Sequence, residues 1–326
     1  MIRVHVIGAA GFAGAQLAAL VEAHPHFELG QITARADAGR RLVDVAPQYR
    51  VTRELTVYEP EAVAAGDLAA VAYPHAQAAP LVAALIDRGV RVVDISADHR
   101  LRDIAAYPTW YGFDHPRPDL VGEAVYGLPE RNREAIRTAR LVANPGCYPE
   151  ASILGLLPLV GGIADVVIDA KSGVSGAGKT PSEAVHFSSV TDSIVAYKVY
   201  GHRHTPEIEQ ELGVDVTFTA HLVPVDRGLL ATCYARLIDG PMHADDLRQR
   251  YVDFYAEHPF VEVVGSPPGM RAVQHTNYAQ ICPVIDPRGG RVTVFAVIDN
   301  IGKGAAGQAL QNLNLMAGRP EDEGLR

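Results

Sequence analysis

The chain is poor in cysteine, in lysine and in long apolar runs. Three of its 326 residues are cysteine, and four of its 29 basic residues are lysine. Three widely separated cysteines do not make a disulfide framework, so we expect a reducing compartment. The net charge of −9 excludes a general nucleic-acid binder, which needs a basic face. No apolar run approaches the roughly 20 residues that span a bilayer, and no targeting segment precedes the first strand pattern. The sequence therefore predicts a cytoplasmic protein with neither a membrane nor a nucleic-acid partner.

The order of the apolar runs predicts two domains of different kinds. In the first half, strand patterns at 2–8, 27–34 and 90–96 alternate with helical spacing, which is typical of a doubly wound parallel sheet of the Rossmann type. From about residue 163 longer strands follow one another, which indicates an α+β domain with a mostly antiparallel sheet. Helical periodicity then returns. We expect an α/β chain with one domain at 1–146, completed by a returning helix at 302–326, and a second domain at 147–301.

A glycine-rich turn follows the first strand pattern and opens the first helix. Such a turn lets a pyrophosphate approach the backbone at a helix N-terminus. It predicts a dinucleotide site made by Gly8, Gly11, Phe12, Ala13 and Gly14. At the end of the second strand, Thr33 and Arg35 stand where an NAD site has an acid, so NADP(H) is favoured. Asp37, two residues further on, keeps NAD open.

Cys147 follows a strand end and a polar Asn144-Pro145-Gly146 turn, and it precedes a helical pattern. A thiol at a helix N-terminus lies beside unpaired amides and the positive end of the helix dipole, which lower its pKa. Cys233, inside an apolar strand pattern, has the setting of a buried structural cysteine. Cys147 is therefore the candidate nucleophile.

Two histidines, His202 and His204, are the candidate bases. They precede a helix that we expect Thr205 to cap and Gly213 to end. The positive potential at a helix N-terminus disfavours the imidazolium form and keeps a neutral base available. No cysteine or acid at ligand spacing completes a zinc site, so we expect no metal. His186 and His221 are weaker candidates for the base.

Residues 173–180 read "GVSGAGKT" and match the phosphate-loop pattern of ATPases and kinases. A phosphate loop normally follows the first strand of its sheet, where this chain already has its glycine-rich turn. We interpret the match as coincidental, and a nucleotide-dependent kinase or ATPase as the rival function from a different class.

Many ordered blocks of the sequence together resemble the N-acetyl-gamma-glutamyl-phosphate reductases, within the wider family of aspartate-semialdehyde dehydrogenase. The most specific blocks are "GAAGFAG", "DISADHRL", "ANPGCYP", "GHRHTPEI", "HLVPVDRG" and "DNIGKGAAGQALQNLNLM". The resemblance implies NADPH-dependent reduction of a small acyl phosphate to an aldehyde in arginine biosynthesis, by a homodimer or homotetramer. It implies an NADP-binding first domain and a catalytic, oligomerisation second domain.

The resemblance also implies roles for individual residues. Cys147 is the nucleophile, with His204 as first and His202 as second choice of base, and Asn144 lies with them. The loop of Ser175, Gly176 and Gly178 and the strand-end residue Asn300 lie against the cofactor. The residues expected to bind the anionic substrate are Arg100, Lys179 and Arg227.

Several alternatives stay open at this point. The same chemistry on an aminoadipyl phosphate, free or bound to a carrier protein, differs by one methylene, and a non-catalytic NADP-binding regulator would keep the fold. Two departures from the family pattern also bear on the substrate. Glu150 stands where relatives usually have threonine, and Ser189 where they usually have glutamate. We expect these two positions to be coupled.

Overall fold

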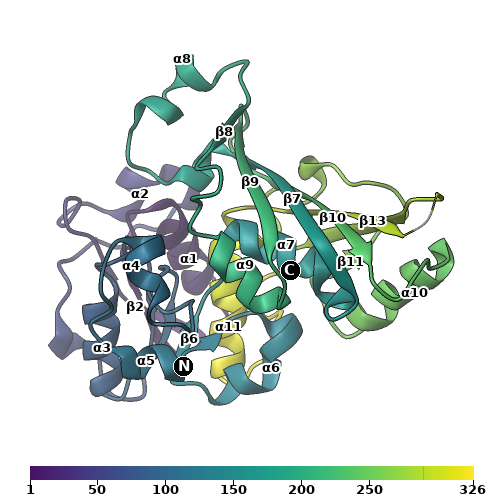
Figure 1. The fold of residues 1–326 in the computed structure, drawn as a ribbon. Helices are drawn as coiled ribbons and strands as arrows, with labels where there is room; N and C mark the ends of the chain where they lie inside the picture. Colours follow the sequence, from purple (N-terminus) through teal and green to yellow (C-terminus); the bar gives the residue numbers. More distant parts are fainter. Residues whose placement is uncertain (289) are drawn as a thin grey trace. The chain divides into compact units, whose positions relative to one another are not determined.

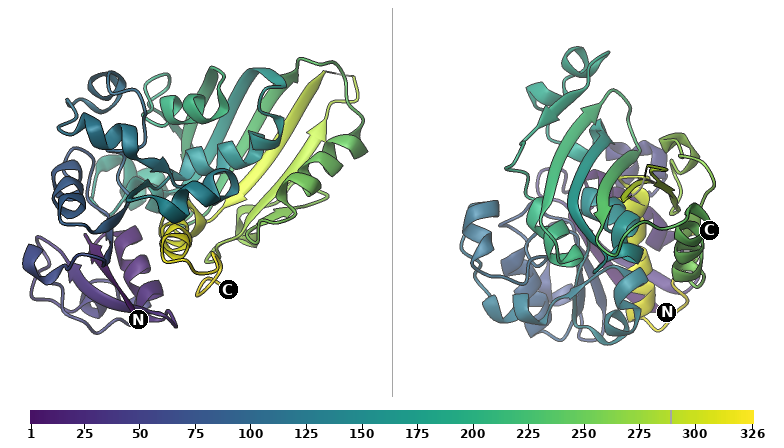
Figure 2. Two further views of the ribbon diagram at one scale, coloured as in Figure 1. Left: turned by 90° about the horizontal axis from the view of Figure 1, so that it is seen from below. Right: turned by 45° about the vertical axis from the view of Figure 1, so that its right-hand side comes forward.

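The computed structural model describes residues 1–288 and 290–326 (Figures 1 and 2). The chain divides into two compact units, each with its own sheet. Unit 1 consists of Met1–Gly146 and Ala305–Arg326, and unit 2 is Cys147–Gly304. The returning segment begins at Ala305 rather than at the expected 302.

Unit 1 is built on six parallel strands in the order β2-β1-β3-β4-β6-β5. The chain passes from β2 on one side of β1 to β3 on its other side, so the strand order reverses at β1. Open α/β sheets bind ligands at such a switch point, beyond the carboxyl ends of the strands. This topology confirms the doubly wound Rossmann-type prediction. The strands are β1 (Ile2–Ile7), β2 (Phe27–Thr33), β3 (Leu68–Val71), β4 (Arg91–Asp94), β5 (Val125–Tyr126) and β6 (Leu141–Ala143).

Helices cover both faces of this sheet. Successive strand residues point to opposite faces, so each face carries apolar side chains that a helix buries. Val4 and Val6 of β1 share a buried cluster with helices α1 (Phe12–Glu22) and α11 (Gly307–Met316). Ile7 belongs instead to a cluster with α3 (Ala79–Asp87) and α5 (Pro118–Glu123). The remaining α-helices of unit 1 are α2 (Leu42–Val45), α4 (Ala106–Tyr111) and α6 (Pro129–Thr138).

The returning helix α11 is fixed in unit 1 by buried amide side chains. Gln308 and Asn312 are fully buried, and both donate hydrogen bonds of 2.9 Å to the carbonyl of Gly127. Asn312 also donates to Oδ1 of Asn144 at 3.0 Å. Buried amides are stable only when bonded, so these contacts specify where the returning helix docks.

Unit 2 is built on seven strands in the order β11-β12-β13-β10-β7-β9-β8. The β7–β9 and β11–β12 pairs are parallel and the other four pairs are antiparallel, which confirms a mostly antiparallel second sheet. The strands are β7 (Ile163–Gly173), β8 (Val195–Tyr197), β9 (Val216–Val223), β10 (Leu229–Leu237), β11 (Val261–Val263), β12 (Ala279–Ile285) and β13 (Arg291–Ile298).

Three helices of unit 2 pack on the face of this sheet that carries its buried side chains: α7 (Cys147–Leu156), α9 (Thr205–Leu212) and α10 (Ala244–Tyr255). A Cβ at Gly155 would lie 3.4 Å from the Cβ of Ala296, so a glycine there lets α7 lie close to the sheet. The hydroxyl of Tyr251 in α10 donates to the carbonyl of Gly155 at 2.7 Å. Helix α7 therefore packs on the sheet and is hydrogen-bonded to the neighbouring helix α10. A fourth helix, α8 (Phe187–Val190), lies in the segment before β8 (Figure 1).

Candidate active site

Cys147 is the first residue of both unit 2 and helix α7. Its side chain is half-buried, whereas Cys233 and Cys282 are buried in the strands of unit 2. Burial raises the pKa of Cys233 to about 12 and raises that of Cys282. The first backbone N–H groups of a helix have no partner within it, so they favour negative charge at its first residue. Cys147 is the cysteine that has the surroundings of a nucleophile.

An aromatic cluster surrounds Tyr148, the residue that follows Cys147. The rings of His202 and His204 lie 5.6 and 5.9 Å from the Tyr148 ring, and the two histidine rings are 4.8 Å apart. Tyr197 of β8 lies 5.3 Å from His202, and its hydroxyl is 3.4 Å from that of Tyr148. Burial, together with the nearby Cys147 thiolate, raises the pKa of Tyr197 to about 12. The fold thus brings both histidines into the neighbourhood of Cys147.

His202 is neutral in this cluster. Burial, together with the positive charges of Arg203 and Lys198, lowers its pKa to about 4. Its Nδ1 accepts the backbone N–H of His204 at 3.1 Å. Because the neutral ring carries one proton, that proton must be on Nε2. His202 can therefore donate a hydrogen bond through Nε2, but its basic nitrogen is already used.

His204 occupies the N-cap position of α9, which begins at Thr205. The expectation that Thr205 caps this helix is wrong, because Thr205 is itself the first helical residue and no side chain bonds the cap. Gly213 ends the helix in the left-handed conformation, as expected. A histidine at an N-cap faces the positive end of the helix dipole, which favours its neutral form.

Glu150 and Lys303 form an ion pair beneath Cys147. Glu150 lies in the first turn of α7, and Lys303 lies in the π-helical turn Gly302–Ala306 that follows β13. Both side chains are fully buried, with Nζ and Oε1 3.6 Å apart. A Cβ on the next residue, Gly304, would lie 2.8 Å from the Cβ of Cys147. The turn is therefore packed directly on the cysteine, at a spacing that only glycine permits.

Unit 1 carries the expected dinucleotide turn at the carboxyl end of β1. Gly8 has a φ of 96°, and a Cβ there would lie 2.7 Å from the carbonyl oxygen of Ala72. A Cβ at Gly14 would overlap the carbonyl of Gly8. Thr33 is fully buried and accepts the N–H of Gly8 at 3.3 Å, so it supports the turn from below. Gly11 precedes α1 as its N-cap.

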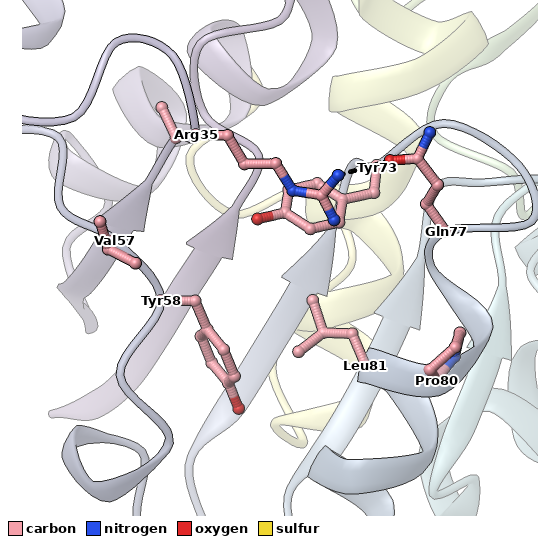
Figure 3. A pocket seen from close by; sticks show the side chains of 8 residues that line it. Arg35, Val57, Tyr58, Tyr73, Gln77, Pro80 and Leu81 are labelled. Atoms are coloured by element: carbon pink, nitrogen blue, oxygen red, sulfur yellow. Dashed lines mark hydrogen bonds between the residues drawn. The ribbon is translucent and has the colours of Figure 1, made fainter.

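Arg35 lies at the mouth of a cavity of about 650 Å³ beside this turn (Figure 3). Its guanidinium stacks over the Tyr73 ring, 4.7 Å from the ring centre, and donates to Oε1 of Gln77 at 2.6 Å. The rival acid, Asp37, is paired with Arg40 at 2.6 Å. These residues fit a phosphorylated nucleotide: a glycine turn at a helix start, an aromatic wall and a cation held in place.

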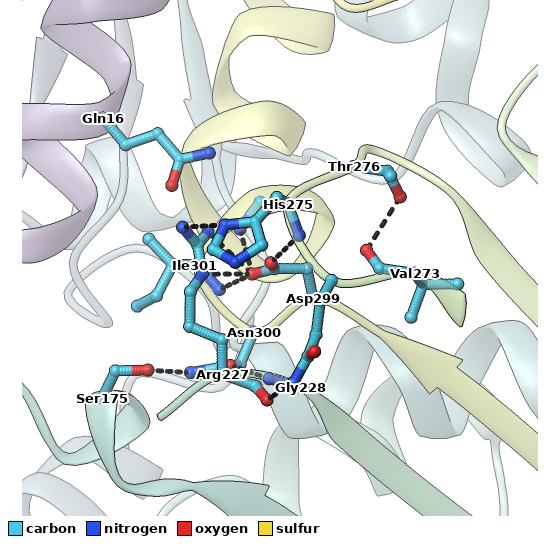
Figure 4. A network of polar contacts seen from close by, with 12 residues as sticks. Gln16, Ser175, Arg227, Gly228, Val273, His275, Thr276, Asp299, Asn300 and Ile301 are labelled. Carbon is cyan, nitrogen blue, oxygen red and sulfur yellow. Dashed lines mark hydrogen bonds and ion pairs between the residues drawn. The ribbon is translucent and has the colours of Figure 1, made fainter. Parts of the chain in front are cut away.

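Ser175 and Asn300 form one polar network in unit 2 (Figure 4). The amide of Asn300 donates to Oγ of Ser175 at 2.9 Å and accepts the N–H of Gly228 at 2.7 Å. The neighbouring Arg227 donates twice to Asp299, at 2.8 and 3.1 Å, through an almost buried guanidinium. The charge of Arg227 is therefore balanced within unit 2.

Comparisons with known proteins agree on one family. Residues 3–139 match the semialdehyde dehydrogenase NAD binding domain, and residues 147–300 match the semialdehyde dehydrogenase dimerisation domain. N-acetyl-gamma-glutamyl-phosphate reductases from Dehalococcoides mccartyi and Desulforudis audaxviator are each 47% identical to the chain. They align with 99% and 100% of it and with 97% and 98% of their own lengths. The chain belongs to the N-acetyl-gamma-glutamyl-phosphate reductase family. It is an oxidoreductase with a nicotinamide-binding domain and an oligomerisation domain.

Solved structures of semialdehyde dehydrogenases share the fold. Aspartate semialdehyde dehydrogenase II from Vibrio cholerae, complexed with ASA, aligns with a TM-score of 0.73 at 18% identity over 97% of this chain and 98% of its own. The Candida albicans enzyme with NADP has the same TM-score at 17% identity and the same coverage.

The phosphate-loop pattern has no phosphate-loop structure in this family member. Strand β7 runs into a 3-10 turn, Val174–Ala177, in which Gly176 is exposed, and Gly178 and Lys179 are exposed in the loop that follows. Within the described chain the next α-helix is the four-residue α8, which begins at Phe187, so the loop does not run directly into a helix N-terminus. The geometry opposes a kinase or ATPase function.

Other expected residues have varied surroundings. Arg100 is nearly buried in unit 1 and donates to the carbonyl of Ile95 at 2.9 Å. Asn144 is fully buried and donates to the carbonyl of Ala305 at 3.2 Å, besides accepting from Asn312. His186 is exposed, and His221 pairs with Asp169 at 3.1 Å. Ser189 is exposed on α8, whereas the Glu150 carboxylate has Lys303 as its partner.

The described residues contain neither a group of three or more histidine, cysteine or acidic side chains placed to hold a metal nor a helix long and apolar enough to cross a membrane. Sequence reasoning missed Tyr73, Tyr148, Tyr197 and Lys303. The signal for Lys303 was present, because it is one of only four lysines and lies between two glycines.

We expect Gly304→Ala to lower kcat at least tenfold and to destabilise the protein by about 1 to 3 kcal/mol, because the added methyl must displace Cys147 or the turn. Steady-state kinetics and thermal unfolding measure both effects. Gly265→Ala is the matched control, since a Cβ there meets nothing within 4 Å. Equal behaviour of the two variants would show that the turn is not held against Cys147.

The pKa of His202 makes stability depend on pH. A folded-state pKa of about 4, below the ordinary 6.5, means that stability is intact above pH 6.5 and is lost as pH falls toward 4. The His202→Asn variant keeps an acceptor for the His204 amide. Between pH 7 and 4.5, its free energy of unfolding, measured with urea, should fall by about 2 kcal/mol less than that of the wild type. The exposed His186→Asn should behave as the wild type does. Parallel losses in all three proteins would contradict the burial effect.

Proposed function

We propose that the protein catalyses the NADPH-dependent reduction of N-acetyl-gamma-glutamyl phosphate to N-acetylglutamate 5-semialdehyde and phosphate, in arginine biosynthesis. The carrying observation is the half-buried Cys147 at the start of α7, beside a cluster that holds two buried histidines. The full-length similarity to N-acetyl-gamma-glutamyl-phosphate reductases supports the same substrate.

The mechanism follows from the surroundings of Cys147. Its thiolate attacks the carbonyl carbon of the acyl phosphate, and backbone N–H groups at the start of α7 stabilise the oxyanion. Phosphate leaves, and the acyl group stays on Cys147 as a thioester. NADPH, when bound, supplies the hydride that reduces this acyl group. Collapse of the Cys147 thiohemiacetal then releases the aldehyde and returns the thiolate.

The two histidines have different parts in this scheme. We assign proton transfer to His204, since the basic nitrogen of His202 already accepts the His204 amide. His202 orients the segment and offers its Nε2 proton as a hydrogen-bond donor. Asn144, fully buried and bonded to the returning segment, positions the strand end that leads into Cys147.

The cofactor site spans several expected residues. We assign the pyrophosphate to the turn of Gly8, Gly11, Phe12, Ala13 and Gly14, and the 2′-phosphate of NADP to Arg35, with Thr33 supporting the turn. Ser175, Gly176, Gly178 and Asn300 are assigned to the nicotinamide side. Arg100, Lys179 and Arg227 are the proposed residues for the anionic groups of the substrate. We further propose a homodimer or homotetramer that works in the cytoplasm.

Phosphate-dependent NADP reduction with candidate semialdehydes tests the function. N-acetylglutamate semialdehyde should be oxidised, Cys147→Ser should abolish turnover while leaving NADPH affinity nearly unchanged, and Cys282→Ala should stay active. Faster turnover of the aminoadipate semialdehyde would overturn the substrate assignment, which depends on one methylene worth about 1 to 3 kcal/mol. No turnover with any aldehyde would overturn the function.

Arg35→Ala should raise the KM for NADPH at least tenfold and leave the KM for NADH nearly unchanged, because only NADPH carries the 2′-phosphate. Arg40→Ala is the control: its guanidinium is exposed nearby but already pairs with Asp37. Kinetics with both cofactors measure the effect. If Arg35→Ala raised the two KM values equally, Arg35 would not recognise the 2′-phosphate.

A further inference from the structure

The ion pair of Glu150 and Lys303 has no place in the scheme above, although it lies at the start of the nucleophile's helix. Glu150 is three residues after Cys147 in α7, so the two side chains lie on the same side of the helix, one turn apart. A carboxylate there is favoured by the helix dipole but opposes a neighbouring thiolate. Because Glu150 is fully buried, water does not screen its charge.

Lys303 reaches the same place from a distant part of the chain. Its ammonium lies 3.6 Å from Glu150 and 6.0 Å from the centre of the Phe260 ring, and its side chain is fully buried. Each ion is costly to bury without an opposite charge close by. The following residue, Gly304, is packed on Cys147.

We propose that Lys303 is a positioning residue of the reaction: its ammonium neutralises Glu150 and ties the Gly302–Ala306 turn to the first turn of α7, so that Cys147 ionises readily in a fixed place. The proposal rests on the proposed function in one respect, the role of Cys147 as nucleophile. It assigns to Glu150 the part of a charge partner for Lys303 rather than of a general base or a substrate ligand.

Substitution of Glu150 or Lys303 leaves the other titratable groups around Cys147 unchanged. Tyr197 faces it from β8, Tyr148 is its neighbour in α7, and His202 and His204 lie against the Tyr148 ring. A change in the ionisation of Cys147 on substitution of Glu150 or Lys303 therefore reports on the ion pair.

The test is the pH dependence of Cys147 alkylation by iodoacetamide, measured peptide by peptide by mass spectrometry. Glu150→Gln leaves the positive charge alone and should shift the midpoint about 1 pH unit lower. Lys303→Met leaves the Glu150 carboxylate without its ammonium partner and should shift the midpoint higher. The Glu150→Gln/Lys303→Met double variant should return to within about 0.3 pH units of the wild type. Glu262→Gln, which changes an exposed carboxylate of unit 2, should leave the profile unchanged.

Thermal unfolding separates the charge effect from simple loss of structure. The double variant should melt above both single variants, since each single change leaves one buried charge without its counterion. If Lys303→Met does not fold while the double variant does, the pairing is supported. An unshifted Glu150→Gln profile, a shift in the same direction for both single variants, or a double variant less stable than either would overturn the proposal.

Alkylation requires no substrate, so this test is independent of turnover. Shifted profiles in a protein without reductase activity would keep the ion pair and reject the proposed function. Reductase activity with unshifted profiles would keep the proposed function and reject the role of the ion pair. In an active protein, both single variants should lower kcat at least fivefold with the KM for NADPH unchanged, and the double variant should recover most of that loss.

Discussion

The beginning of helix α7 is the constraint on which the rest of unit 2 depends. Cys147 is the first residue of this helix, where the backbone N–H groups of the first turn favour a negative charge. The helix is held against the sheet at Gly155, and the turn at Gly304 packs on Cys147 from another side. The close approach at Gly304 is possible only because that residue has no side chain.

The charges around this helix start are balanced in pairs. Glu150 meets Lys303, and Arg227 meets Asp299. His202 is kept neutral by burial and by the positive charges of Arg203 and Lys198, so it adds no further charge to the cluster. Pairing keeps the buried carboxylates of Glu150 and Asp299 from opposing a negative charge on Cys147.

The family comparison and the geometry support the function in different ways. Full-length identity of 45–47% to N-acetyl-gamma-glutamyl-phosphate reductases establishes the family. The geometry shows how this chain arranges the parts, with Tyr148 and Tyr197 around the histidines and Arg35 held between Tyr73 and Gln77. The phosphate-loop pattern shows that a short sequence match does not establish a phosphate site until the structural element that follows it is known.

The sequence by itself determined the parallel first sheet, the second, mostly antiparallel sheet, the glycine turn and the position of Cys147. Each of these depends on neighbours within a few residues, through side-chain alternation, glycine backbone freedom and the helix start. Only the tertiary structure decided that Lys303 meets Glu150, that Asn312 meets Asn144, and that His202 accepts the His204 amide and is left with its proton on Nε2. It also placed the N-cap of α9 at His204 rather than at the expected Thr205. Most of these contacts join residues that are distant in the chain. All of them depend on burial, because burial determines which charged and protonated forms are stable. A local sequence pattern does not contain that information.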